Sequence, residues 1–249
     1  MTDLTAQFFN EVQTRLARLA GPNPAIDEAV RLCAESLEAG GVMQAFGTGH
    51  SEAFAMEIAG RAGGLIATNR IALRVLVLRG GRPASDLGAA EFERDPAIGE
   101  NLLALFPIDP RDIFLIASNS GVNGSILGVA LAAKARGHKV IAVTSLDHTS
   151  KVTPKHPSGK RLSEVADVVI DNLAPFGDST MKLEGGIGIG AVSSITAAFI
   201  AQRITFGVAE TIRQHGKTPP VFLSANIPGG DEHNRALQDL YGDRIRGEA

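Results

Sequence analysis

The segment Ser118 to Asn123, SNSGVN, gathers hydroxyl and amide side chains around a glycine at the end of an apolar run. Ser118, Ser120 and Asn123 can donate hydrogen bonds, and Gly121 lets the backbone approach a ligand closely. A helix-like pattern, GSILGVALAAKARG, follows directly. Free N–H groups and the positive end of a helix dipole are the components of an anion site. Because one helix N-cap needs only one such residue, the cluster favours phosphate binding over plain capping.

A second loop, AFGTGHSEAF, follows an earlier apolar run. Gly47 and Gly49 permit close backbone approach, and His50 or Ser51 can cap the helix that follows. The same residues also fit an ordinary turn between a strand and a helix, and both interpretations stay open. The loop is not a dinucleotide fingerprint, because Glu52 occupies the third glycine position. No GxxxxGK[ST] phosphate loop occurs in the sequence.

Residues after this loop could move protons. At 100° per residue, His50, Phe54, Glu57 and Arg61 share one face of a helix. A carboxylate at Glu57, flanked by His and Arg, would lie close to a ligand at the helix N-terminus. The same spacing fits an i,i+4 ion pair between Glu57 and Arg61 equally well. We expect Glu52, in the first helical turn, to be structural.

Two further candidates lie in later polar segments. Glu184, in GDSTMKLEGGIGIG, precedes a long helix and fits either an active-site carboxylate or a surface glutamate. His233, in GGDEHN, fits either a solvated histidine or a residue that reaches a neighbouring subunit. His50 and Glu57 could supply two metal ligands, but no third ligand stands at a suitable spacing, so we expect no metal. We expect no other cofactor.

The elements that position these residues alternate along the chain. The 249 residues, 44% hydrophobic and 20% charged, suffice for a substantial core. We expect strands at 42–46, 70–78, 112–117, 139–144 and 166–171. We expect helices at 4–19, 25–38, 50–62, 99–105, 124–136 and 190–214, with a short one near the C-terminus. This alternation predicts right-handed βαβ units.

The expected fold is α/β, a three-layer αβα sandwich with a central parallel sheet of the flavodoxin-like kind. It forms a single domain with a helical pair at 1–39, a core at 40–214 and a tail at 215–249. Ligands of such sheets bind beyond the carboxyl ends of the strands. The two loops described above should therefore meet there.

Composition narrows the function classes. The net charge of −3 argues against a nucleic-acid or anionic-membrane binder. The one cysteine, Cys33, excludes an intrachain disulfide and suits a reducing cytosol. The N-terminus reads as an amphipathic helix and not as a signal peptide, and no run of about 18 apolar residues occurs. We expect a cytoplasmic protein.

The loops GTGHS and SNSGVN together resemble the two signatures of the sugar isomerase (SIS) domain family, and the resemblance extends from Ala25 to about Ile212. In that family a Ser-x-Ser-Gly-x-Thr loop holds a sugar phosphate. Asn123 stands where the family usually has Thr or Ser, and its amide can still donate. The resemblance implies these phosphate-binding residues: Thr48, Ser51, Ser118, Asn119, Ser120, Gly121 and Asn123.

The tail PPVFLSANIPGGDEHN and the segment KHPSGKRLSEVADVVIDN are similar to stand-alone bacterial phosphoheptose-isomerase-like proteins, and to a subgroup that dehydrates N-acetylglucosamine 6-phosphate. This resemblance implies a lyase that eliminates water from a phosphorylated amino sugar. Aldose–ketose isomerisation is the alternative among enzymes. A non-catalytic sugar-phosphate sensor is a third possibility, although sensors usually carry a DNA-binding helix-turn-helix, which does not fit before Ala25.

Elimination requires a base for the proton at C2, an acid for the departing hydroxide and a proton shuttle for ring opening. We assign Glu57 as the base, Glu184 as the acid, and His50 or His233 to ring opening. SIS relatives form dimers or tetramers. The resemblance therefore implies a homodimer or homotetramer with shared active sites, in which His233 could act in a neighbour's pocket.

Overall fold

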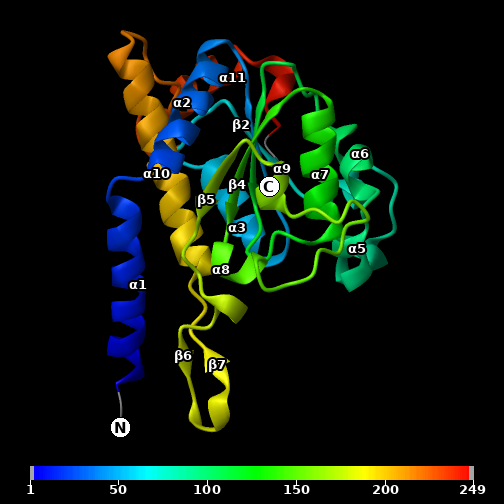
Figure 1. Ribbon diagram of the computed structural model, residues 1–249. Coiled ribbons are helices and arrows are strands. Elements are labelled where there is room, and N and C mark those ends of the chain that lie inside the picture. The colour runs from blue at the N-terminus through cyan, green and yellow to red at the C-terminus, as the bar shows by residue number, and fades with distance from the viewer. Residues whose placement is uncertain (1–2, 247–249) are drawn as a thin grey trace.

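The computed structural model describes residues 3–246, and its centre is a five-stranded parallel sheet (Figure 1). The strands pair in the order β2-β1-β3-β4-β5. They are β1 (Met43–Gly47), β2 (Thr68–Ile71), β3 (Ile113–Ala117), β4 (Lys139–Thr144) and β5 (Val168–Asp171). This is the strand order of flavodoxin-like folds. The expected αβα class with a parallel sheet is confirmed.

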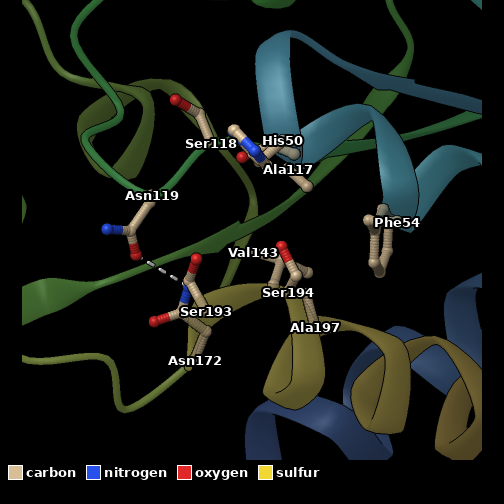
Figure 2. A pocket seen from close by; sticks show the side chains of 11 residues that line it. His50, Phe54, Ala117, Ser118, Asn119, Val143, Asn172, Ser193, Ser194 and Ala197 are labelled. Atoms are coloured by element: carbon tan, nitrogen blue, oxygen red, sulfur yellow. Dashed lines mark hydrogen bonds between the residues drawn. The ribbon is translucent and has the colours of Figure 1, made fainter. Parts of the chain in front are cut away.

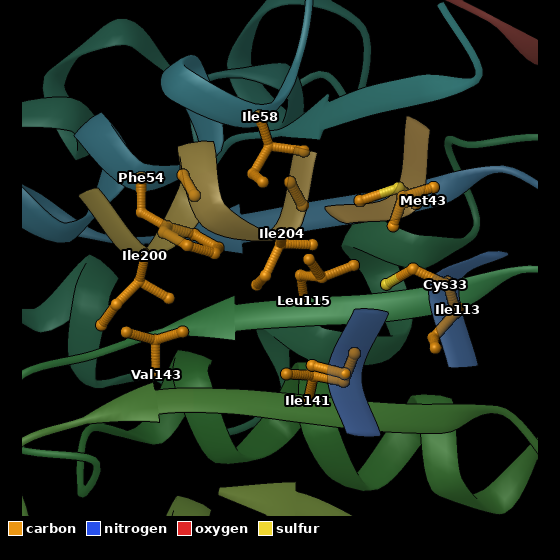
Figure 3. Close-up of a cluster of buried hydrophobic side chains, with 14 of the residues drawn as sticks. Cys33, Met43, Phe54, Ile58, Ile113, Leu115, Ile141, Val143, Ile200 and Ile204 are labelled. Carbon is orange, nitrogen blue, oxygen red and sulfur yellow. The ribbon is translucent and has the colours of Figure 1, made fainter. Parts of the chain in front are cut away.

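Helices α2, α3 and α10 cover one face of the sheet, and α1 packs against α10 on the outside (Figure 1). The core on this face joins strand residues such as Leu115 to helix residues such as Ile204 (Figure 3). Asn23 is the N-cap of α2, and its side chain accepts a hydrogen bond from the Ile26 N–H. The bounds are α1 (Leu4–Ala20), α2 (Pro24–Glu38), α3 (Glu52–Ile58) and α10 (Ser193–Gln214).

The opposite face of the sheet is covered by α4, α6, α7 and α9, with α5 beside α7 (Figure 1). Phe114 and Ile116 point to this face, whereas Leu115 between them points to the other. The strands are therefore buried on both sides, as a parallel sheet requires. The bounds are α4 (Val75–Leu78), α5 (Ala90–Arg94), α6 (Ile98–Leu103), α7 (Gly124–Ala135), α8 (Leu146–Thr149) and α9 (Leu162–Val165).

The strand expected at 70–78 is wrong beyond Ile71. The pairing of this strand with β1 ends at Ile71, which lies opposite Phe46. The apolar residues after Ile71 therefore have no strand to pair with. They form the short helix α4 instead, in which Val75 is fully buried.

The helix expected at 50–62 is shorter in the structure. It ends at Ile58, because the chain becomes extended at Ala59 and Gly60 has a positive φ of 76°. Only glycine adopts that conformation readily.

An antiparallel hairpin that the sequence did not predict precedes α10. It projects from the carboxyl edge of the sheet and lies beside α1 in Figure 1. Gly185 and Gly186, both with φ of 82°, form its tip. The hairpin consists of β6 (Met181–Lys182) and β7 (Gly188–Ile189).

The base of the hairpin is fastened to α8. The Phe176 N–H donates a hydrogen bond of 2.7 Å to Asp147, which also pairs with Lys151. Lys151 and this N–H hold the pKa of Asp147 below its usual range. The charged carboxylate thus ties the hairpin to the end of β4.

The C-terminal segment lies at the amino edge of the sheet. The Phe222 backbone pairs with Gly63 and Gly64, and α11 (Gly230–Gln238) follows. Arg244 donates to the fully buried carboxylate of Asp112 at 2.6 Å, immediately before β3. The tail therefore covers the edge opposite the carboxyl ends. The expected helical pair and tail include residues 1–2 and 247–249, which lie outside the described residues.

Candidate functional site

A small pocket opens at the carboxyl ends of the strands, where β1, β3, β4 and β5 meet the start of α10 (Figure 2). Its wall comes from both predicted loops and from two segments that the sequence did not point to. The lining residues are His50, Ser51, Phe54, Ala117, Ser118, Asn119, Val143, Asn172, Ser193, Ser194 and Ala197. The expectation that the two loops meet at this edge is confirmed.

The loop after β3 is a tight turn closed by its own hydroxyl. The Gly121 N–H donates to Ser118 Oγ at 3.1 Å, and Gly121 has a φ of 64°. A Cβ at this glycine would lie 3.0 Å from Thr144 Oγ1. The Asn119 carbonyl accepts from the Ser145 N–H, so the turn rests on the end of β4. The sequence places glycine where the turn requires it.

Neither loop uses its polar residues as helix caps. Ser51 occupies the N-cap position of α3 and Asn123 that of α7, yet neither side chain makes a capping hydrogen bond. Plain capping therefore does not account for these two residues, and Ser51 lines the pocket instead.

Two loop amides meet at the pocket wall. Asn172, directly after β5, donates from Nδ2 to Asn119 Oδ1 at 3.1 Å (Figure 2). Asn172 is buried and also accepts from the Ala174 N–H through Oδ1. Asn172 was not among the predicted residues, although it directly follows a strand, as the two predicted loops do.

The start of α10 forms the facing wall, with Ser193 and Ser194 (Figure 2). Asp178 Oδ1 accepts hydrogen bonds from the N–H groups of Val192 and Ser193, and its Oδ2 accepts from Ser193 Oγ. The N-terminus of this 22-residue helix carries partial positive charge. These serines were not among the predicted residues. The start of a long helix after the last strand of the sheet is the signal that could have identified them.

A carboxylate joins the two loops beside the pocket. Glu93 Oε1 accepts from Thr48 Oγ1 at 2.6 Å and from Asn123 Nδ2 at 2.8 Å. Thr48 and Asn123, both expected to bind phosphate, therefore point to Glu93 and do not line the pocket. Glu93 lies in the polar segment 80–98, which has no regular apolar pattern, so no sequence signal distinguishes it from its neighbours.

Glu57 lies on α3 beyond the pocket-lining Phe54. Its Oε1 accepts from Arg61 and, at 2.6 Å, from Gln202 Nε2 on α10. The i,i+4 ion pair is thus present, and Glu57 does not line the pocket. Glu52 pairs with Arg74 at 2.8 Å, in keeping with a structural role.

The remaining candidates fall in three places. His50 is exposed and lines the pocket. Glu184 is exposed at the hairpin tip, and His233 is fixed at the amino edge by a 2.9 Å bond from Nε2 to the Val221 carbonyl. The chain brings His50, Ser51, Ser118 and Asn119 together in the pocket. The other predicted site residues do not line it: Thr48, Glu57, Ser120, Gly121, Asn123, Glu184 and His233.

The chemistry of the pocket is that of a neutral, donor-rich anion site. Hydroxyls, amides and helix N-termini recognise phosphate and sugar groups. Within residues 3–246, His50 is the one pocket-lining residue with a titratable side chain. In the same part of the chain, no three His, Cys, Asp or Glu residues are grouped to hold a metal ion. Nor does this described part contain a helix with the length and apolar character of a membrane span.

Comparison with protein families and curated sequences gives one consistent group. A model of the SIS domain matches residues 7–145. A UPF0309 protein of Listeria monocytogenes serovar 1/2a is 39% identical over 221 residues, which cover 88% of this chain and 89% of the relative. A UPF0309 protein of Geobacillus kaustophilus is 33% identical over 241 residues, covering 96% and 94%.

Solved structures share the fold. A phosphoheptose isomerase from Francisella tularensis superposes with a TM-score of 0.58 at 17% identity, covering 84% of this chain and all of that one. The phosphoheptose isomerase of Neisseria gonorrhoeae gives a TM-score of 0.53 at 18% identity, covering 83% and 95%. At these identities the similarity concerns the fold.

Proposed function

The chain belongs to the SIS domain family, and from that premise we propose that it is an enzyme that binds a sugar phosphate in the pocket at the carboxyl edge. The observation that carries the proposal is the convergence of donors from three elements on one pocket. The loop after β1 contributes Ser51, the loop after β3 contributes Ser118 and Asn119, and α10 contributes Ser194. Neutral donors around helix N-termini suit an anionic ligand.

We assign the phosphate to the turn at the start of α7. Ser118 and Ser120 supply hydroxyls there, and the positive φ of the buried Gly121 allows the tight turn that places them next to each other. The N-terminus of α7, a 12-residue helix, adds its dipole. Ser51 assists from the first loop.

The sugar would lie against the opposite wall. Asn119, Asn172, Ser193 and Ser194 are neutral groups that both donate and accept hydrogen bonds. Such groups suit sugar hydroxyls and the amide of an N-acetyl group. This wall supports a phosphorylated amino sugar as the substrate class.

The reaction we propose is elimination of water from N-acetylglucosamine 6-phosphate. In the ring-opened aldehyde, Glu57 takes the proton from C2, the electron pair forms the C2–C3 double bond, and the C3 hydroxyl leaves as water after protonation. His50, in the pocket, is assigned to ring opening. Glu184 is the proposed acid, with His233 as the second candidate for ring opening.

Glu57, Glu184 and His233 all lie outside their own chain's pocket. Glu57 is one helical turn beyond the pocket-lining Phe54. By contrast, Glu184 at the hairpin tip and His233 at the amino edge require a second copy. A homodimer or homotetramer with shared sites would bring them to a neighbour. Exposed apolar side chains on the two projecting elements, Phe9 on α1 and Ile187 on the hairpin, support such an assembly.

A second function is aldose–ketose isomerisation. It needs a base that moves the C2 proton to C1, and no departing group. The shared fold with two phosphoheptose isomerases favours it. A third function is that of a non-catalytic sugar-phosphate sensor. It is favoured because, among the described residues that line the pocket, only His50 has a titratable side chain.

Incubation with hexose, heptose and N-acetylhexosamine phosphates in deuterated water, followed by proton NMR, distinguishes these functions. We expect an unsaturated product from N-acetylglucosamine 6-phosphate. A ketose carrying deuterium next to the carbonyl would show isomerisation instead. Unchanged spectra with every compound, together with measurable binding, would show a sensor.

A further inference from the structure

The carboxylate of Glu93 accepts hydrogen bonds from two donors at the carboxyl edge of the sheet, where a ligand is expected. Its Oε1 accepts both the Thr48 hydroxyl and the Asn123 amide. We propose that Glu93 holds these donors in the free protein and that a ligand's phosphate displaces it, so that Glu93 sets how tightly the site binds anions. This inference rests on the proposed sugar-phosphate function.

The position of Glu93 in the fold supports this. Thr48 directly follows β1, and Asn123 ends the loop after the neighbouring strand β3. The helices that follow these strands, α3 and α7, lie on opposite faces of the sheet. This is the topological switch point, where open α/β sheets bind their ligands. A carboxylate held there by two neutral donors takes the place of an external anion.

The backbone of Glu93 is fixed against α7. Ser125 Oγ donates to the Glu93 carbonyl at 2.6 Å. A Cβ on Gly124 would lie 1.8 Å from the Arg94 carbonyl oxygen, and one on Gly128 would lie 2.6 Å from that of Pro96. The chain therefore crosses α7 in direct backbone contact, and the two glycines permit this. Only the side chain of Glu93 is left to move.

The side chain is half-buried, so rotation would carry its carboxylate toward solvent. A phosphate that enters brings more negative charge and can also bind Ser120 and the N-terminus of α7. Two anions close together in this partly buried place would repel each other. Binding of the phosphate and departure of the Glu93 carboxylate are therefore coupled.

The test is calorimetric titration of the full-length protein with inorganic phosphate, N-acetylglucosamine 6-phosphate and N-acetylglucosamine. In Glu93→Gln the side chain keeps its size but loses its charge, and we expect both phosphorylated ligands to bind about tenfold more tightly. N-acetylglucosamine should bind as it does to the wild type. Glu91→Gln removes an exposed carboxylate from the same short helix and should leave all three affinities unchanged.

Glu93→Ala serves as a second variant, because it removes the acceptor altogether and should also bind phosphate more tightly. If the wild type binds phosphate and both folded Glu93 variants bind it equally well or more weakly, the inference is overturned. Glu93 would then only join the two loops. Absence of phosphate and sugar-phosphate binding in the wild type and both variants would overturn the proposed function as well. These two failures are thus distinguishable.

Discussion

Gln202 on α10 donates a hydrogen bond of 2.6 Å to Oε1 of Glu57 on α3. Arg61 donates to the same oxygen from the start of the loop that follows the helix. The proposed base is therefore held in one orientation by two elements. One helical turn separates it from Phe54, which lines the pocket.

Glu57→Gln tests this carboxylate as the base. The amide keeps the size of the side chain but loses the basic oxygen, so we expect turnover to fall by about 10²–10⁴ with ligand affinity nearly unchanged. Deuterium exchange at C2 should disappear. Glu52→Gln, on the same helix, is the matched control and should retain exchange. If Glu57→Gln exchanges at the wild-type rate, the ion pair with Arg61 is the better account of Glu57.

Mixing two inactive variants tests the shared site. In a dimer of one Glu57→Gln chain and one Glu184→Gln chain, one of the two sites would contain both wild-type carboxylates. An equal mixture of exchanging dimers should thus recover about a quarter of wild-type turnover. No recovery in mixed dimers verified by mass spectrometry would remove Glu184 from the neighbour's site.

Arg244→Ala tests the attachment of the tail. Loss of the arginine would leave the buried Asp112 carboxylate without its charged partner, and we expect the free energy of unfolding to fall by about 3–5 kcal/mol. Arg213→Ala breaks an exposed ion pair with Glu210 and should change stability little. Chemical denaturation measures both. Equal effects would mean that Asp112 does not need Arg244.

Gly124→Ala tests the contact that fixes Glu93. The added methyl group would overlap the Arg94 carbonyl, so we expect a loss of about 1–3 kcal/mol in stability. Gly88→Ala is the control, because a Cβ there has open space around it. Stability equal to that of the control would contradict the close packing of this segment on α7.

The fold could be predicted from the sequence where an apolar run is also paired along its length in the sheet. Strands β1, β3, β4 and β5 are apolar runs with a partner along their length, and their positions followed from the sequence. The run at 70–78 is equally apolar, but whether Val75 extends a strand or enters a helix depends on where β1 ends. That information lies in another part of the chain.

The same limit applies to the site. Ser118, Asn119 and Ser51 belong to loops that directly follow strands, and the rule for parallel sheets was enough to bring them together. Glu93 reaches the site through the packing of α5 on α7, and Asn172 through its pairing with Asn119. No local pattern marks such residues. The distant positions of Glu184 and His233 likewise follow from the hairpin and the tail, which have weak sequence signals.

Phosphate binding by the turn at Ser118–Gly121 is tested most directly at Ser120, because the Ser118 hydroxyl also closes the turn. The measurement is calorimetric titration of Ser120→Ala with N-acetylglucosamine 6-phosphate and with N-acetylglucosamine, beside Ser150→Ala as an exposed control. A charge-assisted hydrogen bond contributes about 1.5–3 kcal/mol, so the phosphorylated ligand should bind at least about tenfold more weakly. The unphosphorylated sugar should bind as it does to the wild type and to the control. Equal weakening of both ligands, or of neither, would contradict phosphate binding by this turn.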